Sequence, residues 1–420
     1  MTFKTQTKTL TPALLEEQLE AFLTRELPRR ETLYDYYQGA QPVRKGPAVP
    51  GRPNNLLSAN YAKYISDVHT GYFMGVAPTL TFEGKRIQDH MTRALDSADL
   101  HRMLFAAARD MSVCGEGYLL TYLSQKGPRL ARLDPRETFV LTHGVEEEIW
   151  AAVRLGPEGK GRTREGEVYL PGQVRAFVLE GKRISLGAAR PLPLEGLAVT
   201  RFCNNGECRG DFEPVLTLLD AYNILLSGAM DDMQSVANAF LALYGVQDTL
   251  PEDIDAANRS RVLCLGDNGK AEFVVKDLSP DAIALLKGTL VQDLLSITMT
   301  PNLGDDAFAG NSSGVALEYK LWGVEQARSA KEQGFSGGLY HIIGLFFQAL
   351  RQMGLPAGGA CSARFYKNLP QDRTRLCEDL KTLGDTVSRR TKLELLPFVS
   401  DPEEEEARIR AEQRGEEEEV

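Results

Sequence analysis

A long helical pattern, followed by a short β pattern and a second helical pattern, constrains the fold of this chain more than any other feature. The stretch "GDFEPVLTLLDAYNILLSGAMDDMQSVANAFLALYG" repeats apolar residues every three or four positions, which predicts a helix over residues 213–244. A helix of about 30 residues is roughly 45 Å long. Globular helices average about 11–12 residues, so we expect this one to cross between regions or to line an assembly. Asp211 is expected to cap its N-terminus.

The next segment predicts a small β module between two helices. "RVLCLGDNGKAEFVVKDL" contains two β-rich runs around Asp267, Asn268 and Gly269, which are the residue types that favour a hairpin turn. Pro280 stands where a helix begins, and "DAIALLKGTLVQDLLSIT" carries a second apolar stripe. The order helix, β module, helix is expected to project the β module away from the body of the protein.

The rest of the chain predicts a mixed α+β protein. Residues 11–40 have helical spacing that Pro28 interrupts, and "LLSANYAKYISDVHTGYFMGVAP" predicts a further helix. Between about residues 117 and 200, short β segments alternate with Gly and Pro turns, which predicts a meander.

A second long helical pattern follows the polar stretch "NLGDDAFAGNSSG". It extends over about 40 residues, and it contains Gly334 and the pair Gly337 and Gly338. Each glycine costs about 1 kcal/mol in a helix, so a kink is expected there.

The composition is that of a folded soluble protein, since hydrophobic residues make up 43% of the 420 residues and charged residues 25%. That length suggests two or three domains. No apolar stretch reaches the roughly 18–20 residues of a membrane span, and the N-terminus carries no secretion signal. We therefore expect folding in a cytoplasm and no membrane partner.

The charge limits how the protein can meet nucleic acid. The net charge is −10, and acidic residues concentrate in "DPEEEEARIRAEQRGEEEEV", which we expect to be a solvated, partly disordered tail. Tight binding to a nucleic-acid backbone needs many Lys and Arg to displace counterions. The acidic balance therefore excludes a tight grip on DNA but is compatible with a surface past which DNA slides.

The stretch "FAGNSSGVALEYKLW" permits two interpretations. Gly310, Ser312 and Gly314 match the G-x-S-x-G spacing of a hydrolase nucleophile elbow, but no strand pattern precedes them, as such an elbow requires. Only His341 lies downstream as a base, inside the long helical pattern. We therefore expect a flexible loop that ends where a helix begins, and a serine hydrolase at Ser312 is the weaker alternative.

Other chemical motifs are absent from the sequence. Six cysteines are scattered without C-x-x-C spacing, and the nearest pair, Cys203 and Cys208, has no histidine close by. We expect free thiols there. Walker A, G-x-G-x-x-G and H-E-x-x-H motifs are missing as well. The sequence predicts no catalytic residue, no metal site and no cofactor.

Three tyrosines, Tyr34, Tyr36 and Tyr37, lie before a basic stretch in "ETLYDYYQGAQPVRKG". Aromatic residues beside basic ones can stack on single-stranded nucleic acid. Packing within the protein and a subunit-wrapping arm are the favoured interpretation.

Four stretches, in chain order, resemble portal proteins of long-tailed, siphophage-type bacteriophages. They are "YDYYQGAQPV", "NNLLSANYAKYISDVHTGYFMGVAP", "NNGECRGDFEPVLTLLDAYNILLSG" and "GNSSGVALEYKLWGVEQARSAKEQGF". The resemblance implies a homo-oligomeric ring of about twelve subunits at one capsid vertex, through which double-stranded DNA passes during packaging and ejection. Another head–tail connector or capsid-associated structural protein is the alternative.

The resemblance also implies a domain map. A wing surrounds a stem of two helices, a β-containing clip faces the motor or the tail, and a crown faces the capsid interior. In this chain the map gives an N-terminal arm (1–24), an α+β wing (25–224), a first stem helix (225–244), a clip (245–279), a second stem helix (280–299), a tunnel loop (300–312), a long kinked wing helix (313–369) and a helical crown with the acidic tail (370–420).

The resemblance further implies where partners bind. DNA, without sequence specificity, is expected to face the tunnel-loop residues Asn302, Gly304, Asp305, Asp306, Ala309, Gly310, Asn311, Ser312 and Ser313. The terminase large subunit or a head–tail adaptor is expected at the clip residues Asp267, Asn268, Gly269 and Lys270. Major capsid and scaffolding proteins are further implied partners. The protein would be made in the host bacterial cytoplasm and reside in the virion.

Overall fold

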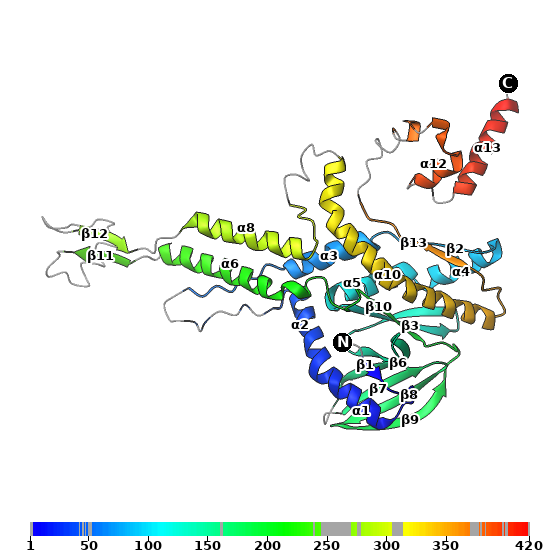
Figure 1. The fold of residues 1–420 in the computed structure, drawn as a ribbon, viewed down its shortest axis with the longest axis horizontal. Helices are drawn as coiled ribbons and strands as arrows, with labels where there is room; N and C mark the ends of the chain where they lie inside the picture. The colour runs from blue at the N-terminus through cyan, green and yellow to red at the C-terminus, as the bar shows by residue number, and fades with distance from the viewer. Residues whose placement is uncertain are drawn as a thin grey trace. The chain divides into compact units, whose positions relative to one another are not determined.

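The fold is that of a computed structural model (Figure 1). It describes residues 3–41, 43, 46, 48, 53–159, 163–237, 240–244, 270–274, 279–304, 314–369, 378, 380–382, 384–396, 399 and 402–418. The chain divides into two compact units, Met1–Lys367 and Asn368–Val420. Helices account for 51% and strands for 23% of the structure, which confirms the predicted mixed α+β class.

A six-stranded sheet contains most of the predicted meander. Strands β5 to β9 pair antiparallel in sequence order, whereas β1 joins the edge of β5 in parallel. The strands are β1 (Phe3–Thr5), β5 (Thr138–His143), β6 (Glu148–Glu158), β7 (Thr163–Leu170), β8 (Gln173–Glu180) and β9 (Arg183–Pro191). Sequence analysis does not predict β1, because three residues are too few to show period-two alternation.

The N-terminal helices pack on this sheet. α1 (Pro12–Ala21), a π-helical turn η1 (Phe22–Glu26) and α2 (Leu27–Gln38) follow one another without a gap. Phe22 is fully buried in the sheet's core cluster and stacks on Phe139 with 4.7 Å between ring centroids. The interruption predicted at Pro28 is present as a change of helix type, because the π-helical turn ends at Glu26 and α2 begins at Leu27. The change of helix type lets Pro28 occupy the first turn of α2, where its missing N–H is tolerated.

A second sheet lies between two helices in the larger unit. Its strand order is β10-β3-β4, with bounds Val199–Cys203, Glu116–Ser124 and Gly127–Leu133. α5 (Leu100–Cys114) packs against β3 and α10 (Gly314–Gln352) against β10. The surrounding core cluster also receives α3 (Tyr61–Met74), α4 (Lys85–Ser97) and the two-stranded sheet of β2 (Thr79–Phe82) and β13 (Cys361–Arg364).

The predicted order of helix, β module and helix is present with different bounds. α6 (Leu216–Ala237) and α8 (Pro280–Ile297) pack side by side, and β11 (Phe240–Tyr244) pairs antiparallel with β12 (Lys270–Val274) (Figure 1). The helix predicted over 213–244 is wrong at both ends, since Glu213–Val215 forms a 3-10 turn. The apolar run "FLALY" fits either a helix or a strand, and pairing with β12 makes it a strand.

The long C-terminal helical pattern forms the single helix α10, which continues through the three glycines where a kink is predicted. Two of these glycines permit close packing against β10. A Cβ atom at Gly334 would lie 2.7 Å from the carbonyl oxygen of Cys203, and one at Gly338 would lie 2.6 Å from the ring of Phe202. The absence of a side chain thus lets the helix backbone approach the strand directly.

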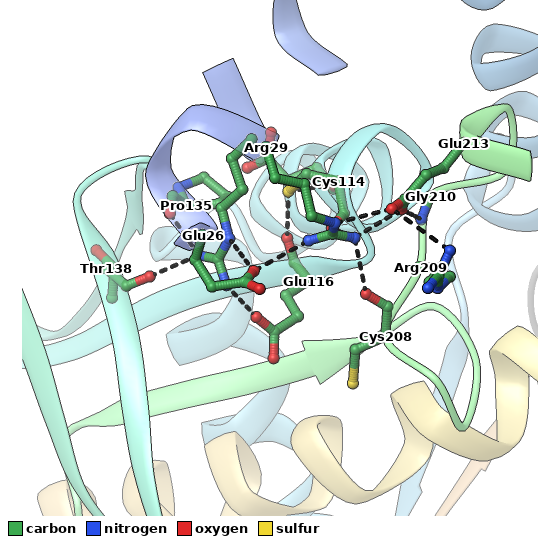
Figure 2. A network of polar contacts seen from close by, with 12 residues as sticks. Glu26, Arg29, Cys114, Glu116, Pro135, Thr138, Cys208, Arg209, Gly210 and Glu213 are labelled. Atoms are coloured by element: carbon green, nitrogen blue, oxygen red, sulfur yellow. Dashed lines mark hydrogen bonds and ion pairs between the residues drawn. The ribbon is translucent and has the colours of Figure 1, made fainter. Parts of the chain in front are cut away.

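A buried arginine joins α2 to both sheets (Figure 2). The fully buried guanidinium of Arg30 donates to the carbonyl oxygen of Thr138 at 2.9 Å and to the carboxylate of Glu116 on β3. Burial would raise the pKa of Glu116, but Arg30 and Arg201 hold it below its usual value. Glu116 is therefore ionised at neutral pH. Removing one member of such a buried pair costs about 3–5 kcal/mol, because the other charge is left uncompensated.

The neighbouring arginine ties α2 to the segment that leads into α6. Arg29 donates two hydrogen bonds to the carboxylate of Glu213, from Nε at 2.8 Å and from Nη2 at 2.6 Å. Nη2 also donates to the carbonyl oxygen of Cys208 at 3.4 Å (Figure 2). Two parallel hydrogen bonds between one guanidinium and one carboxylate fix the orientation of Glu213 relative to α2 as well as its distance from that helix.

The smaller unit contains η3 (Gly384–Thr386), α12 (Arg389–Leu395) and α13 (Pro402–Glu418). The acidic tail, for which partial disorder is predicted, forms α13. Ion pairs one turn apart support that helix, such as Arg410 with Glu406 at 2.7 Å. Among the described residues, no helix combines the length and apolar character that a membrane crossing requires.

Two neighbouring glycines of α10 provide a matched test of its packing. We expect Gly338→Ala to destabilise the protein by about 1–3 kcal/mol, because the new methyl group overlaps the buried ring of Phe202. Gly337→Ala meets nothing within 4 Å and should stabilise the helix by up to about 1 kcal/mol. Denaturant unfolding measures both, and equal stability of the two variants would contradict the close packing.

Candidate functional site

The described part of the predicted tunnel loop begins with a sharp chain reversal after α8. Met299 adopts a left-handed backbone with φ of 53°. The amide of Thr300 donates to the carbonyl oxygen of Leu295 at 2.9 Å, and the amide of Met299 donates to that of Ser296 at 3.2 Å. This is the Schellman arrangement that usually carries glycine at the left-handed position. Because methionine stands there instead, the sequence gives no signal for the reversal.

Two side chains of α3 hold this reversal in place. The Nε2 atom of His69 lies 2.9 Å from the carbonyl oxygen of Thr298. The hydroxyl of Tyr64 donates to the carbonyl oxygen of Pro301 at 2.8 Å and accepts from the amide of Leu303 at 3.0 Å. Burial lowers the pKa of His69, so its ring is neutral at pH 7 and Nε2–H donates to the carbonyl.

The same helix also contacts α10, on the other side of the predicted loop. The hydroxyl of Tyr72 donates to the carboxylate of Glu325 at 2.7 Å. Glu325 in turn pairs with Arg328 at 2.9 Å. α3 therefore binds both the element before the predicted loop and the helix after it.

A buried ion pair completes this junction. The ammonium group of Lys331 on α10 lies 2.7 Å from both carboxylate oxygens of Asp211 and also donates to Asn204. The hydroxyl of Ser112, at the end of α5, donates to Asp211 at 2.5 Å. Burial would raise the pKa of Asp211, but Lys331, with His69 and Asn204, lowers it to about 2. The carboxylate is therefore charged throughout the physiological range.

This position corrects the prediction that Asp211 caps the first long helix. The α-helix begins only at Leu216, and the oxygens of Asp211 are occupied by Lys331, Asn204 and Ser112. An aspartate before a helical pattern is a common cap, but a buried lysine offers a stronger partner than an amide.

The structure describes three of the predicted DNA- and motor-facing residues. Asn302 and Gly304 are exposed, and the amide of Gly304 donates to the Asn302 side chain at 3.3 Å. Lys270 is exposed at the start of β12 and is paired in register with Tyr244. The remaining predicted site residues, Asp267, Asn268, Gly269, Asp305, Asp306, Ala309, Gly310, Asn311, Ser312 and Ser313, lie outside the described residues.

The tyrosine cluster near the N-terminus contributes to packing. Tyr34 and Tyr36 are buried, and their hydroxyls donate to Asp110 at 2.8 Å and to Asp220 at 2.6 Å. The favoured interpretation, packing within the protein, is confirmed for both side chains. The wrapping-arm part of that interpretation stays a prediction.

Large apolar side chains are exposed on the two paired helices and on the first turns of α10. The most exposed among them are Met233 (66%), Leu285 (72%), Tyr319 (77%) and Trp322 (63%). An open groove of about 860 Å³ runs between α8 and α10, with Val291, Leu295 and Met299 among its lining residues. Contiguous exposed apolar patches mark interaction sites, so these side chains are candidates for a contact with another protein.

The buried ion pair predicts a pH dependence of stability. The pKa of Asp211 is about 2 in the folded protein, against an ordinary value of 3.8. Because the folded state holds the charged form more strongly, the stabilisation is complete above about pH 4 and is lost as pH falls through about 2. This shift corresponds to about 2 kcal/mol.

We expect Asp211→Asn to lower the free energy of unfolding at pH 7 by about 3–5 kcal/mol, because Lys331 is left buried and unpaired. The difference in free energy of unfolding between wild type and variant should decrease by about 2 kcal/mol as the pH falls from 5 to 2. Denaturant unfolding at each pH measures it, and Asp211→Asn combined with Lys331→Met is the control that should recover stability. A difference in unfolding free energy that does not change with pH would contradict the ion pair between Asp211 and Lys331.

Comparisons with known proteins agree with the resemblance seen in the sequence. The family model described as phage portal protein, SPP1 Gp6-like, matches residues 16–419. The portal protein of Bacillus phage SPP1 is 23% identical over 390 residues, which cover 86% of this chain and 76% of that protein. The family match includes both the junction around α3 and the paired helices α6 and α8. The chain therefore belongs to the SPP1 Gp6-like family of phage portal proteins, which form the ring at one capsid vertex and conduct DNA during packaging and ejection.

Proposed function

We propose that this portal subunit closes into a ring of about twelve copies, in which the exposed apolar side chains of α6, α8 and α10 are buried between neighbours. The observation that carries this proposal is the exposure of Leu285, Tyr319 and Trp322, each more than half accessible. A ring requires one face of each subunit to fit a different face of the next. The groove between α8 and α10 supplies a concave apolar surface for such a fit.

In this proposal the domains take the roles that the family map gives them. Residues 25–224 are the wing with the N-terminal arm 1–24, and the parts of α6 and α8 within 225–244 and 280–299 supply the stem. Residues 245–279 are the clip, to which β11 adds the strand Phe240–Tyr244. The region predicted as one long wing helix, residues 313–369, contains α10 only as far as Gln352 and then the strand β13, and residues 370–420 are the crown. The pairing of α6 with α8 and of β11 with β12 supports a stem that leads into a β-containing clip.

The tunnel loop, residues 300–312, is proposed to face double-stranded DNA. Its base is fixed by Tyr64 and His69, while Asn302 and Gly304 are exposed. Small polar residues form weak, exchangeable hydrogen bonds with phosphates, and the carboxylates of Asp305 and Asp306 repel them. Such a surface holds DNA at no fixed register, so the DNA can slide in either direction.

The clip residues Asp267, Asn268, Gly269 and Lys270 are proposed to dock the terminase large subunit during packaging and a head–tail adaptor afterwards. Capsid and scaffolding proteins are proposed to contact the outer parts of the ring. The role is structural throughout, and Ser312 is proposed to act as a loop residue rather than as a nucleophile. Loss of an esterase activity in Ser312→Ala would reverse that assignment.

Electron microscopy of the purified protein, together with its mass in solution, tests the ring. We expect wild type to show rings of about twelve or thirteen subunits with a central channel. Trp322→Asp should shift the population to smaller species, because burying an unpaired charge costs several kcal/mol at each contact. Val145→Asp is the matched control, since Val145 is 95% exposed on a turn of the wing sheet.

Rings that form equally well with Trp322→Asp would show that this face is not the interface. Wild-type protein that stays monomeric even when it is co-assembled with capsid protein would contradict the ring itself.

A packaging assay with capsids tests the tunnel loop. Replacing Asp305 and Asp306 with lysine should slow DNA uptake by roughly tenfold, the effect of about 1.4 kcal/mol on a rate, because added cations bind phosphate. The matched control replaces the same two residues with asparagine, which removes repulsion without adding attraction and should change uptake less. Unchanged packaging by the lysine variant would count against this role.

A further inference from the structure

Two cysteines meet at the turn between β10 and the segment that leads into α6. Cys203 is the last residue of β10, and Cys208 lies in the turn with a left-handed φ of 52°. Their sulfur atoms are 3.1 Å apart, and both side chains are half-buried free thiols. Figure 2 shows the carbonyl oxygen of Cys208 facing Arg29 while its sulfur points the other way. The hydrogen bond to Arg29 therefore leaves the thiol available.

The turn holds these thiols together by contacts that do not involve sulfur. The side-chain amides of Asn204 and Asn205 both donate to the carbonyl oxygen of Arg209 at 2.9 Å. The amide of Cys208 donates to the carbonyl oxygen of Asn205 at 3.1 Å. Gly115 packs so closely that a Cβ atom there would lie 1.9 Å from the carbonyl oxygen of Cys208. The turn is thus preorganised, and joining the sulfurs requires little further ordering.

A metal ion is the competing interpretation, since the Glu116 carboxylate lies within 4.8 Å of both sulfurs. That carboxylate is already engaged by Arg30, by Arg201 at 3.5 Å and by the hydroxyl of Tyr118 at 2.8 Å. Two thiolates on tetrahedral zinc, each at about 2.3 Å, are roughly 3.8 Å apart. A separation of 3.1 Å is shorter than that, so the geometry favours a bond between the sulfurs.

We propose that Cys203 and Cys208 are a dithiol site that a peroxide oxidises to an intrachain disulfide. The thiolate of Cys208 attacks one peroxide oxygen and the O–O bond breaks. The sulfenic acid forms, and the departing hydroxide takes up the proton that Cys208 had released, which gives one water. Cys203 then attacks the sulfenic sulfur, the S–S bond forms, and hydroxide leaves with the proton of Cys203 as a second water. Two thiols and one hydrogen peroxide give one disulfide and two waters.

The surroundings identify Cys208 as the attacking group. The hydrogen bond with Cys203 lowers the pKa of Cys208 against the opposing effects of burial and of Glu116, and the guanidinium of Arg201 adds to the lowering. A thiolate beside a cation reacts faster with oxidants than a thiol does.

The bond would close a short ring of residues immediately before Asp211, the partner of Lys331. Oxidation would therefore stiffen the connection between β10 and the junction that holds α10. The timing rests on the proposed function: a portal is assembled in a reducing cytoplasm and then persists in a particle outside the cell, in an oxidising environment. The subunits would assemble while the two thiols are reduced, and the disulfide would stiffen the turn afterwards.

Peptide mass spectrometry of the full-length protein tests the site. Native protein is treated with hydrogen peroxide, alkylated and digested with trypsin, which releases "FCNNGECR", residues 202–209, with both cysteines in one peptide. We expect this peptide to lose alkylation at both cysteines and to be lighter than the reduced form by two hydrogen atoms. Cys361, a free thiol elsewhere in the larger unit, is the internal control and should remain alkylated at the same dose.

Cys203→Ser and Cys208→Ser should each leave the other thiol alkylated or overoxidised, with no peptide of the lighter mass. The proposal is overturned if both wild-type thiols remain alkylated after peroxide, or if Cys208 stops at a sulfinic acid. It is also overturned if native mass spectrometry shows one bound zinc that protects both thiols. Ring formation is recorded on the reduced sample, so a missing disulfide in normal rings contradicts only this inference.

Discussion

The ion pair between Lys331 and Asp211 is the constraint on which the arrangement of the larger unit depends. Both groups are buried, and neither can be removed alone without leaving a charge in a medium of low dielectric constant. The pair fixes the long helix α10 against the segment between β10 and α6. His69 on α3 holds the end of α8 through its hydrogen bond to the carbonyl oxygen of Thr298. Buried contacts of the larger unit therefore hold the elements on both sides of the predicted tunnel loop.

The portal assignment depends on how much of the chain the family model matches, and not on one motif. The family model spans residues 16–419, which favours a portal over another head–tail connector or capsid-associated protein. The sequence alone offers four short resembling stretches and a pattern of long helices. The exposed apolar side chains at Leu285 and Trp322 are compatible with the burial between subunits that is proposed for the ring.

The fold class and the main helices were predictable from periodicity, whereas the element boundaries were not. The run "FLALY" fits a helix and a strand equally well. It is a strand because it pairs with β12, about 30 residues further along the chain. Pro28 was expected to interrupt the helical pattern, but the sequence does not show that the interruption is a π-helical turn, which places Pro28 in the first turn of α2 where its missing N–H is tolerated. The acidic tail was expected to be partly disordered, because composition alone does not show ion pairs one turn apart, such as Arg410 with Glu406.

The anchoring residues of the site could be predicted only in part. Lys331 lies seven positions after Val324 and four before Phe335, both of which are buried, so a lysine on that apolar face signals a hidden partner. Nothing in the sequence identifies Asp211 as that partner, since 120 positions separate them. Tyr64 and His69 also resemble ordinary residues of an amphipathic helix. They hold the chain reversal at Met299, and no glycine in the sequence marks that reversal.

The parallel pairing of β1 with β5 has a consequence for biosynthesis. Phe3 pairs with Leu141 and Thr5 with His143, so the first strand of the chain needs a partner that the ribosome makes much later. At about 10 residues per second, that interval is on the order of 10 s. During this time the N-terminal residues leave the ribosome without their docking edge. The six-stranded sheet therefore cannot add β1 until β5 has been made.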